Sequence, residues 1–146
     1  MIYYWDTSAI VKVYHREEGS DRAMQMFSEV LSGEKKGAVA YVCLMETISA
    51  FTRRRKELKG NYEAIVARIL QDMRDNLSIV ALEEEIMESA MKLIINHGLK
   101  TLDSIHLATA LFLKKHTSED VAMISADREL LTAAAKEGLD TVNPSE

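Results

Sequence analysis

Four acidic residues, widely spaced along the chain, carry the chemistry that the sequence indicates. They are Asp6, Glu46, Asp103 and Asp127. Carboxylate oxygens are hard ligands that suit Mg²⁺ or Mn²⁺ far better than Zn²⁺. Two carboxylates about 4 Å apart repel by roughly 4 kcal/mol at an effective dielectric constant near 20. A cluster of four therefore needs a cation, and the implied reaction is attack of a metal-activated water on a phosphodiester.

Two of these acids also have a simpler explanation as helix caps. Asp6 and Asp127 each stand where an N-cap residue would stand, and aspartate is a favoured cap. Glu46 is harder to explain in this way because it lies in the apolar segment 42–48. Asp103 lies near the N-terminal end of the segment 102–113, whose apolar character on nearly all sides predicts a buried helix. Burial therefore makes Glu46 and Asp103 the more informative pair.

Short apolar runs that lack strict polar alternation predict strands covered on both faces. These runs are Ile2–Trp5, Ala38–Tyr41, Ser78–Ala81, Val121–Ile124 and Leu139–Val142. Segments of helical period, mostly in pairs, separate them. The pattern predicts a three-layer α/β domain with a central parallel sheet of four to five strands. Because such sheets bind ligands at the carboxyl ends of their strands, we expect all four acids at this edge.

Capping residues and glycines divide the helical segments. Ser20 is predicted to cap one helix, and the helix around Glu46 is predicted to run to about Lys59. Gly98 and Gly138 are expected to end two further helices. The apolar stripe of segment 62–73 is explained by core packing, with a second subunit as the alternative.

Length and composition indicate one domain, residues 1–146, with a net charge of −5. The single cysteine, Cys43, excludes an intramolecular disulfide and is expected to be buried. No apolar run approaches 18 residues, and the first residues do not resemble a secretory signal. The cytoplasm is therefore the expected compartment, and no membrane association is expected.

Four segments around the acids together resemble the motifs of the PIN domain, in the right order. They are Asp6-Thr7-Ser8-Ala9-Ile10-Val11-Lys12, Glu46 after the second strand, Leu102-Asp103-Ser104-Ile105-His106-Leu107-Ala108-Thr109-Ala110, and Ser125-Ala126-Asp127-Arg128-Glu129-Leu130. The resemblance extends from Ile2 to about Val142 and is nearest to the VapC-like toxin ribonucleases. The approach to Glu46 is more apolar than the usual serine-containing pattern.

The resemblance implies a parallel sheet with helices on both sides and a Mg²⁺- or Mn²⁺-dependent ribonuclease that cleaves single-stranded RNA. It makes Asp6 and Asp103 the primary metal ligands, with Glu46 acting directly or through water and Asp127 through water or a second ion. Ser8 and Ser125 fall where the family places polar residues beside the metal. The resemblance further implies a homodimer and, for a toxin, a cognate antitoxin protein.

Several nearby residues have both a functional and a structural interpretation. His106 could orient a carboxylate or contact RNA, although a hydrogen-bonded core histidine is the preferred interpretation. Arg53 and Lys12 could bind RNA phosphates, and the alternative for Arg53 is a solvated cation at a helix carboxyl end. Tyr3 and Trp5 are expected in the core.

Three other functions stay open at this stage. The chain could be a free-standing PIN nuclease in RNA processing, or a catalytically silent PIN scaffold that binds a partner. It could also be a phosphatase with Asp6 as nucleophile, although that chemistry usually has a second acid two residues later, where this chain has Ser8.

Overall fold

The strands form a single sheet in which all neighbouring strands are parallel. The computed structural model describes residues 1–58 and 60–146. The strands are β1 (Ile2–Trp5), β2 (Lys36–Ala40), β3 (Ser78–Val80), β4 (Val121–Ile124) and β5 (Asp140–Val142). Their order across the sheet is β3-β2-β1-β4-β5. The predicted parallel sheet is confirmed.

Helices connect consecutive strands, in pairs except between β4 and β5. They are α1 (Thr7–Tyr14), α2 (Ser20–Leu31), α3 (Tyr41–Arg53), α4 (Tyr62–Asn76), α5 (Glu84–His97), α6 (Thr101–Thr117) and α7 (Arg128–Lys136), with a 3₁₀ helix η1 (Arg55–Leu58) after α3. Pairing of helices between parallel strands is the arrangement that the sequence predicts.

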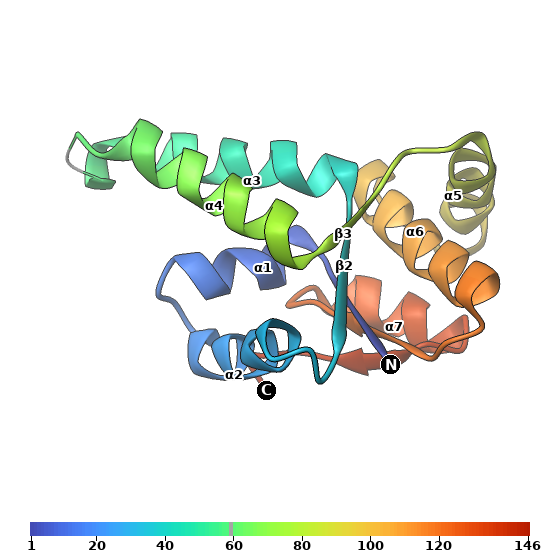
Figure 1. Ribbon diagram of the computed structural model, residues 1–146. Helices are drawn as coiled ribbons and strands as arrows, with labels where there is room; N and C mark the ends of the chain where they lie inside the picture. Colours follow the sequence, from blue (N-terminus) through green and yellow to red (C-terminus); the bar gives the residue numbers. More distant parts are fainter. Residues whose placement is uncertain (59) are drawn as a thin grey trace.

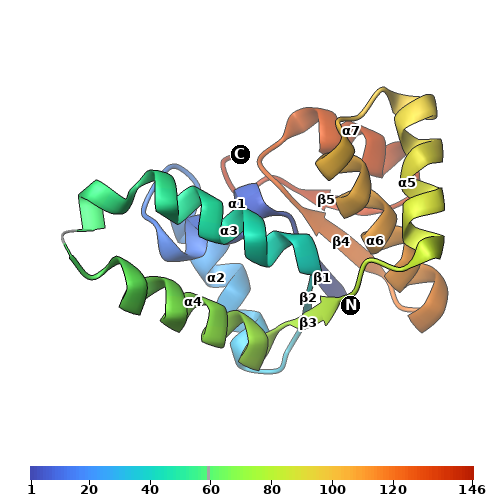
Figure 2. The same ribbon diagram turned by 90° about the horizontal axis from the view of Figure 1, so that it is seen from above.

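Alternate side chains of each strand enter different hydrophobic cores. Ile2 and Tyr4 of β1 pack with α5, α6 and α7, whereas Tyr3 and Trp5 pack with α1 to α4. Figures 1 and 2 show the two groups of helices on opposite sides of the sheet. Because successive side chains of a strand point to opposite faces, both faces must be apolar. The three-layer αβα architecture is thereby confirmed, as is the core position of Tyr3 and Trp5.

The chain reverses its direction of travel across the sheet between β1 and β4. From β1 it moves through β2 to β3 on one side, then returns to β4 beside β1 and continues to β5. At such a switch point the two loops leaving the neighbouring strands diverge and open a crevice. Asp6 follows β1 and Asp127 follows β4, so both lie at this crevice.

Two local predictions are wrong. Ser20 is the first residue of α2, and Gly19 takes the N-cap position without a side-chain cap. The Ser20 hydroxyl turns back instead, accepting from the Glu17 N–H at 2.9 Å and donating to the His15 carbonyl at 3.3 Å. Tyr41 begins α3 instead of ending β2, because pairing with β3 stops at Ala40.

The helix that carries Glu46 is also shorter than predicted. It ends at Arg53, and the chain then tightens into η1, where the Glu57 N–H donates to the Arg54 carbonyl. The predicted end near Lys59 lies outside the described residues. Left-handed backbone at Gly98, with φ of 66°, ends α5, and Gly138, with φ of 88°, follows α7, both as predicted.

The apolar stripe of α4 packs inside the molecule. Ile69 and Met73 are buried in the same core as Phe51 of α3, and Ile65 and Val66 pack against that core. Figure 2 shows α3 and α4 side by side. Core packing therefore explains the stripe.

None of the helices in residues 1–58 and 60–146 is long and apolar enough to cross a membrane.

Candidate active site

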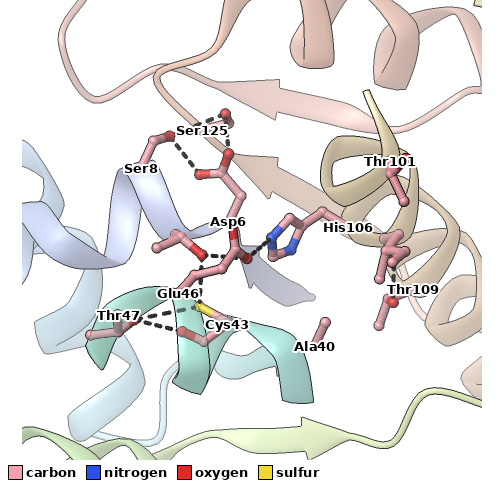
Figure 3. A network of polar contacts seen from close by, with 12 residues as sticks. Asp6, Ser8, Ala40, Cys43, Glu46, Thr47, Thr101, His106, Thr109 and Ser125 are labelled. Atoms are coloured by element: carbon pink, nitrogen blue, oxygen red, sulfur yellow. Dashed lines mark hydrogen bonds and ion pairs between the residues drawn. The ribbon is translucent and has the colours of Figure 1, made fainter. Parts of the chain in front are cut away.

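Asp6 lies at the centre of a polar network where β1 ends. Its side chain is only 4% exposed, and it caps α1 by accepting from the Ala9 N–H at 3.1 Å. Ser8 donates to Oδ1 at 2.7 Å and Ser125 donates to Oδ2 at 2.8 Å (Figure 3). Burial raises the pKa of Asp6, although His106 and these hydrogen bonds oppose the rise. Asp6 is thus held rigidly in a site that does not fully compensate its charge.

Ser8 and Ser125 link Asp6 to the backbone that follows β4. The Ser8 hydroxyl accepts from the Ala126 N–H at 3.0 Å, and the Ser125 hydroxyl accepts from the Asp127 N–H at 2.9 Å. Because each oxygen already accepts a backbone hydrogen bond, each hydroxyl proton is directed at Asp6. The two serines therefore fix the carboxylate against the neighbouring strand.

Glu46 reaches the same crevice from the second turn of α3. Its Oε1 accepts from the Thr7 hydroxyl at 2.9 Å and lies 2.7 Å from His106 Nε2. Burial alone would raise the pKa of Glu46, but the hydrogen bond and charge of His106, together with the Thr7 hydroxyl, lower it overall. Glu46 is therefore anionic and held by one oxygen.

Asp103 and Asp127 form a second acidic pair. Asp103 is half-buried in the first turn of α6, while Asp127 caps α7 by accepting from the N–H groups of Glu129 and Leu130 at 2.9 and 3.2 Å. Burial, the charges of Asp127 and Asp6, and a hydrogen bond with Asp127 raise the pKa of Asp103 to about 6. The charges of Asp127 and Asp6 therefore both act on Asp103.

The donor chemistry of this crevice fits a divalent cation. In the part of the chain that the structure describes, no three acidic, histidine or cysteine side chains already lie close enough to hold a metal ion. Hydroxyl, imidazole and backbone donors instead occupy the carboxylates, as expected for like charges that repel. Burial raises the pKa of both Asp6 and Asp103, and neighbouring acids raise that of Asp103 further, so a bound cation with oxygen ligands would stabilise their charged forms.

The sequence does not reveal all members of the network. The Thr7 hydroxyl donates to Glu46, and the Tyr4 hydroxyl oxygen lies 2.7 Å from His106 Nδ1. His106 is a buried, hydrogen-bonded core residue, which is the interpretation preferred from the sequence. It is also a partner of the Glu46 carboxylate. Thr7 could have been noticed as the neighbour of Asp6, but nothing in the sequence pairs Tyr4 with His106. Cys43 is buried as predicted, and burial raises its pKa to about 12.

A hollow of about 320 Å³ lies beside the acids. It is lined by Thr7, Ser8, Val11, Lys12, Glu17, Ala50, Arg53, Arg54 and Ala126. The Lys12 ammonium is buried there and donates to Glu17 at 3.1 Å and to the Glu18 carbonyl at 2.7 Å. Arg54 also pairs with Glu17 at 3.6 Å, whereas Arg53 is exposed and donates to Ser49 at 2.9 Å. Lys12 is therefore engaged within the fold, and Arg53 is the more available cation.

The sequence profile of the PIN domain matches residues 3–136. The chain belongs to the PIN domain family. PIN domains are nucleases, so the acidic crevice at the switch point lies in a fold associated with phosphodiester cleavage. No curated protein matches the sequence.

Solved structures share the fold at low sequence identity. VapBC2 from Rickettsia felis, bound to a DNA fragment from its promoter, superposes with a TM-score of 0.67 at 15% identity over 98% of each chain. A toxin–antitoxin complex from Klebsiella pneumoniae superposes with a TM-score of 0.63 at 18% identity, over 99% of this chain and 98% of that chain. PAE2754 from Pyrobaculum aerophilum superposes with a TM-score of 0.65 at 16% identity, over 97% of this chain and 84% of that chain. The likeness establishes the PIN fold.

Proposed function

We propose that this protein is a Mg²⁺- or Mn²⁺-dependent endoribonuclease that hydrolyses phosphodiester bonds of single-stranded RNA. The observation that carries the proposal is the pKa of Asp103, which burial and the charges of Asp127 and Asp6 raise at the carboxyl edge of β1 and β4. An acid whose pKa is raised by burial and by neighbouring carboxylates is costly to a fold, and perturbed acids of this kind cluster at functional sites. PIN family membership supports the assignment to nuclease chemistry.

Asp6 and Asp103 would hold the cation, Glu46 would join them directly or through water, and Asp127 would act through water or a second ion. When bound, the cation supplies a water of lowered pKa and positive charge for the phosphate. Ser8 and Ser125 keep both oxygens of Asp6 in place. Thr7 and His106 do the same for one oxygen of Glu46. Such fixed orientation lowers the reorganisation needed in the reaction.

Arg53 is the residue we propose for binding an RNA phosphate next to the cleaved one. It lies two turns after Glu46 on α3 and lines the hollow beside Ser8. At 1.5 Å rise per residue, seven residues place it about 10 Å along the helix from Glu46. Lys12 lines the same hollow, but its pairing with Glu17 makes it a support for the pocket wall.

The biological role that we propose is that of a toxin in a toxin–antitoxin pair, present as a homodimer in the cytoplasm. Support comes from the similar structure from Klebsiella pneumoniae, which is described as a toxin–antitoxin complex, and from VapBC2 of Rickettsia felis bound to a DNA fragment from its promoter. A free-standing nuclease would share the same site. Inducible expression in a bacterial host distinguishes the two roles, because a toxin arrests growth and is rescued by the adjacent gene product.

The decisive experiment measures cleavage of fluorogenic single-stranded RNA by the purified protein with and without Mn²⁺. We expect activity with Mn²⁺, its loss with a chelator, and at least a 100-fold loss in Asp103→Asn with the fold retained in circular dichroism. The matched control is Asp75→Asn on α4, remote from the crevice. Full activity of Asp103→Asn would contradict the proposal.

The same experiment separates the rival functions. A protein that binds neither Mn²⁺ nor RNA would support the silent scaffold. Transfer of phosphate from a phosphomonoester to Asp6 would support the phosphatase, but Asp6 already accepts from Ser8, Ala9 and Ser125. No observed contact favours that second function.

A further inference from the structure

The helical hairpin formed by α3 and α4 carries a run of four consecutive cations where α3 ends. We call Arg53, Arg54, Arg55 and Lys56 the basic tip, of which Arg53 is the last residue of α3, Arg54 its C-cap, and the other two begin η1. Figures 1 and 2 show the hairpin extending away from the sheet. In a chain with a net charge of −5, this run is a local concentration of positive charge.

Most of the basic tip is not neutralised by the fold. Arg54 is half-buried and pairs with Glu17 at 3.6 Å. Arg53, Arg55 and Lys56 are exposed, and among residues 1–58 and 60–146 no salt bridge joins them to a carboxylate. These three charges therefore face solvent, where an anion from outside the molecule can reach them.

A structural role at the end of α3 accounts for only part of the basic tip. Cations in the last turn of a helix interact favourably with its dipole, but the effect falls off within that turn. Arg55 and Lys56 lie beyond the end of α3. The guanidinium carbon of Arg55 lies 4.9 Å from the centroid of the Tyr62 ring, at the start of α4. This stacking orders the side chain, so less conformational entropy is lost when it binds an anion.

The basic tip and the acidic crevice are connected along α3. The hollow of about 320 Å³ is lined both by Ser8, which donates to Asp6, and by Arg53. Glu46 lies about 10 Å along the helix from Arg53 at 1.5 Å rise per residue. Three further residues at about 1.5 to 2 Å each add about 6 Å to reach Lys56. A strand whose phosphate lies at the acids can therefore follow α3 to the basic tip.

We propose that the basic tip binds backbone phosphates of single-stranded RNA on one side of the cleaved bond, about three to five nucleotides away from it. This inference rests on the proposed function. Phosphates of a stacked strand recur about every 3.4 Å, so about five nucleotides cover the distance, and fewer do when the strand is extended. Phosphate contacts position a nucleic acid without reading its sequence. The basic tip therefore sets how far the substrate must extend past the cut, and on which side.

The first experiment measures RNA binding in the absence of cleavage. Fluorescence anisotropy of a labelled, random-sequence RNA of about 12 nucleotides is recorded with Asp103→Asn protein at increasing salt concentration. The tip variant adds Arg55→Gln and Lys56→Gln, which remove both charges and keep a planar amide beside Tyr62. We expect binding about 10-fold weaker at low salt. The slope of log affinity against log salt should fall by about 1.4, because each phosphate contact on a single strand contributes about 0.7.

The control variant replaces two exposed cations far from the basic tip, again in Asp103→Asn protein. It carries Arg74→Gln in the last turn of α4 and Lys92→Gln on α5, so its net charge changes by the same amount. We expect its RNA affinity to stay within about twofold of the parent protein and its salt slope to be unchanged. Both variants should melt at nearly the same temperature as the parent protein, since all four substitutions lie on the surface.

The second experiment measures kcat/KM for cleavage by protein with the natural Asp103. Substrates with one central sequence are extended by about six nucleotides on the 5′ or the 3′ side of the cut. We expect extension on one side to raise kcat/KM about 10-fold and extension on the other side to change it by less than about twofold. Arg55→Gln with Lys56→Gln should remove this gain, whereas Arg74→Gln with Lys92→Gln should retain it.

Three results would overturn the inference: equal RNA affinity and salt slope in the tip and control variants, an equal gain from extension on both sides of the cut, or a lower melting temperature of the tip variant with unchanged RNA affinity. The last result is the one expected of cations that only stabilise the end of α3. A natural protein that cleaves no RNA would refute the proposed function, while the binding experiment still decides whether the basic tip holds RNA.

Discussion

The hydroxyl of Ser125 donates to Oδ2 of Asp6 at 2.8 Å, although the two residues lie 119 positions apart in the sequence. This contact joins the end of β4 to the end of β1 across the switch point. It also supplies one of the few donors that oppose the effect of burial on Asp6.

Replacing Ser125 with alanine removes this donor and leaves Oδ2 of buried Asp6 unpaired. We expect Ser125→Ala to lower the free energy of unfolding by about 1 to 2 kcal/mol, the usual cost of an unsatisfied buried group. Mn²⁺ affinity should fall about 10-fold because Asp6 loses its orientation. Chemical denaturation and calorimetry test both effects. Ser28→Ala on the exposed face of α2 is the control, and equal behaviour of the two variants would count against this role of Ser125.

The stability of the metal-free protein should fall as pH rises from about 4 to about 6. Asp103 has a pKa of about 6 in the folded protein against an ordinary value of 3.8, so the folded state binds more protons than the unfolded state in this window. The free energy of unfolding therefore decreases as Asp103 ionises. Asp103→Asn should flatten this dependence and, at pH 7, stabilise the metal-free protein by about 1 kcal/mol after allowance for solvent screening. Thermal melting without metal measures the change, and a variant less stable than the natural protein at pH 7 would contradict it.

The affinity for Mn²⁺ should increase with pH up to about pH 6 and then level off. Below the pKa of Asp103, binding must displace the proton that this carboxyl shares with Asp127. One displaced proton gives a change of about tenfold in affinity per pH unit. Calorimetry in buffers of different ionisation enthalpy measures both the affinity and the proton release. A pH-independent affinity between pH 5 and pH 7 would refute the participation of Asp103.

Arg53 and Lys12 should respond differently to substitution although both line the same hollow. Arg53→Ala should raise the KM for single-stranded RNA about fivefold, or about 1 kcal/mol, with kcat and stability unchanged. Lys12→Met should lower the free energy of unfolding by about 2 kcal/mol, because it removes hydrogen bonds to Glu17 and to the Glu18 carbonyl. Steady-state kinetics well below the melting temperature separates the two effects. A large KM effect in Lys12→Met would restore its role in RNA binding.

Gly37 should not tolerate a side chain. A Cβ there would lie 2.5 Å from Leu77 Cδ2 and 2.9 Å from Val30 Cγ1. Overpacking of a dense core typically costs about 1 to 3 kcal/mol, so Gly37→Ala should lower the melting temperature. Gly33→Ala offers a comparison without steric contact, since nothing lies within 4 Å of a Cβ there, although its φ of 81° adds backbone strain. Equal stability of Gly37→Ala and the natural protein would show that Leu77 can move aside.

The sheet and the approximate position of the acids could be predicted because they depend on local signals. Apolar runs on both faces specify parallel strands, and an acid directly after such a run must lie at the ligand-binding edge. The ends of the helices were harder to predict from the sequence. Ser20 resembles a cap in the sequence, but its hydroxyl is used by the preceding turn through Glu17.

The contacts within the crevice could not be predicted because they join distant segments. The pairing of Tyr4 with His106 spans 102 positions, and that of Thr7 with Glu46 spans 39. Neither pair has a pattern that periodicity reveals. The pairing of Lys12 with Glu17 is local, but it depends on how the loop after α1 folds back.

Asp6 and Asp127 both cap helices, which is compatible with the metal-binding role proposed for them, and this has a consequence for how the family can diverge. Each of these residues holds the first turn of a helix as well as a corner of the crevice. A descendant that abandons catalysis is still under selection to keep Asp, Asn, Ser or Thr at both positions. Glu46 and Asp103 cap no helix, so they are free to drift first. Loss of these two acids, with the caps retained, would be the recognisable mark of a former enzyme.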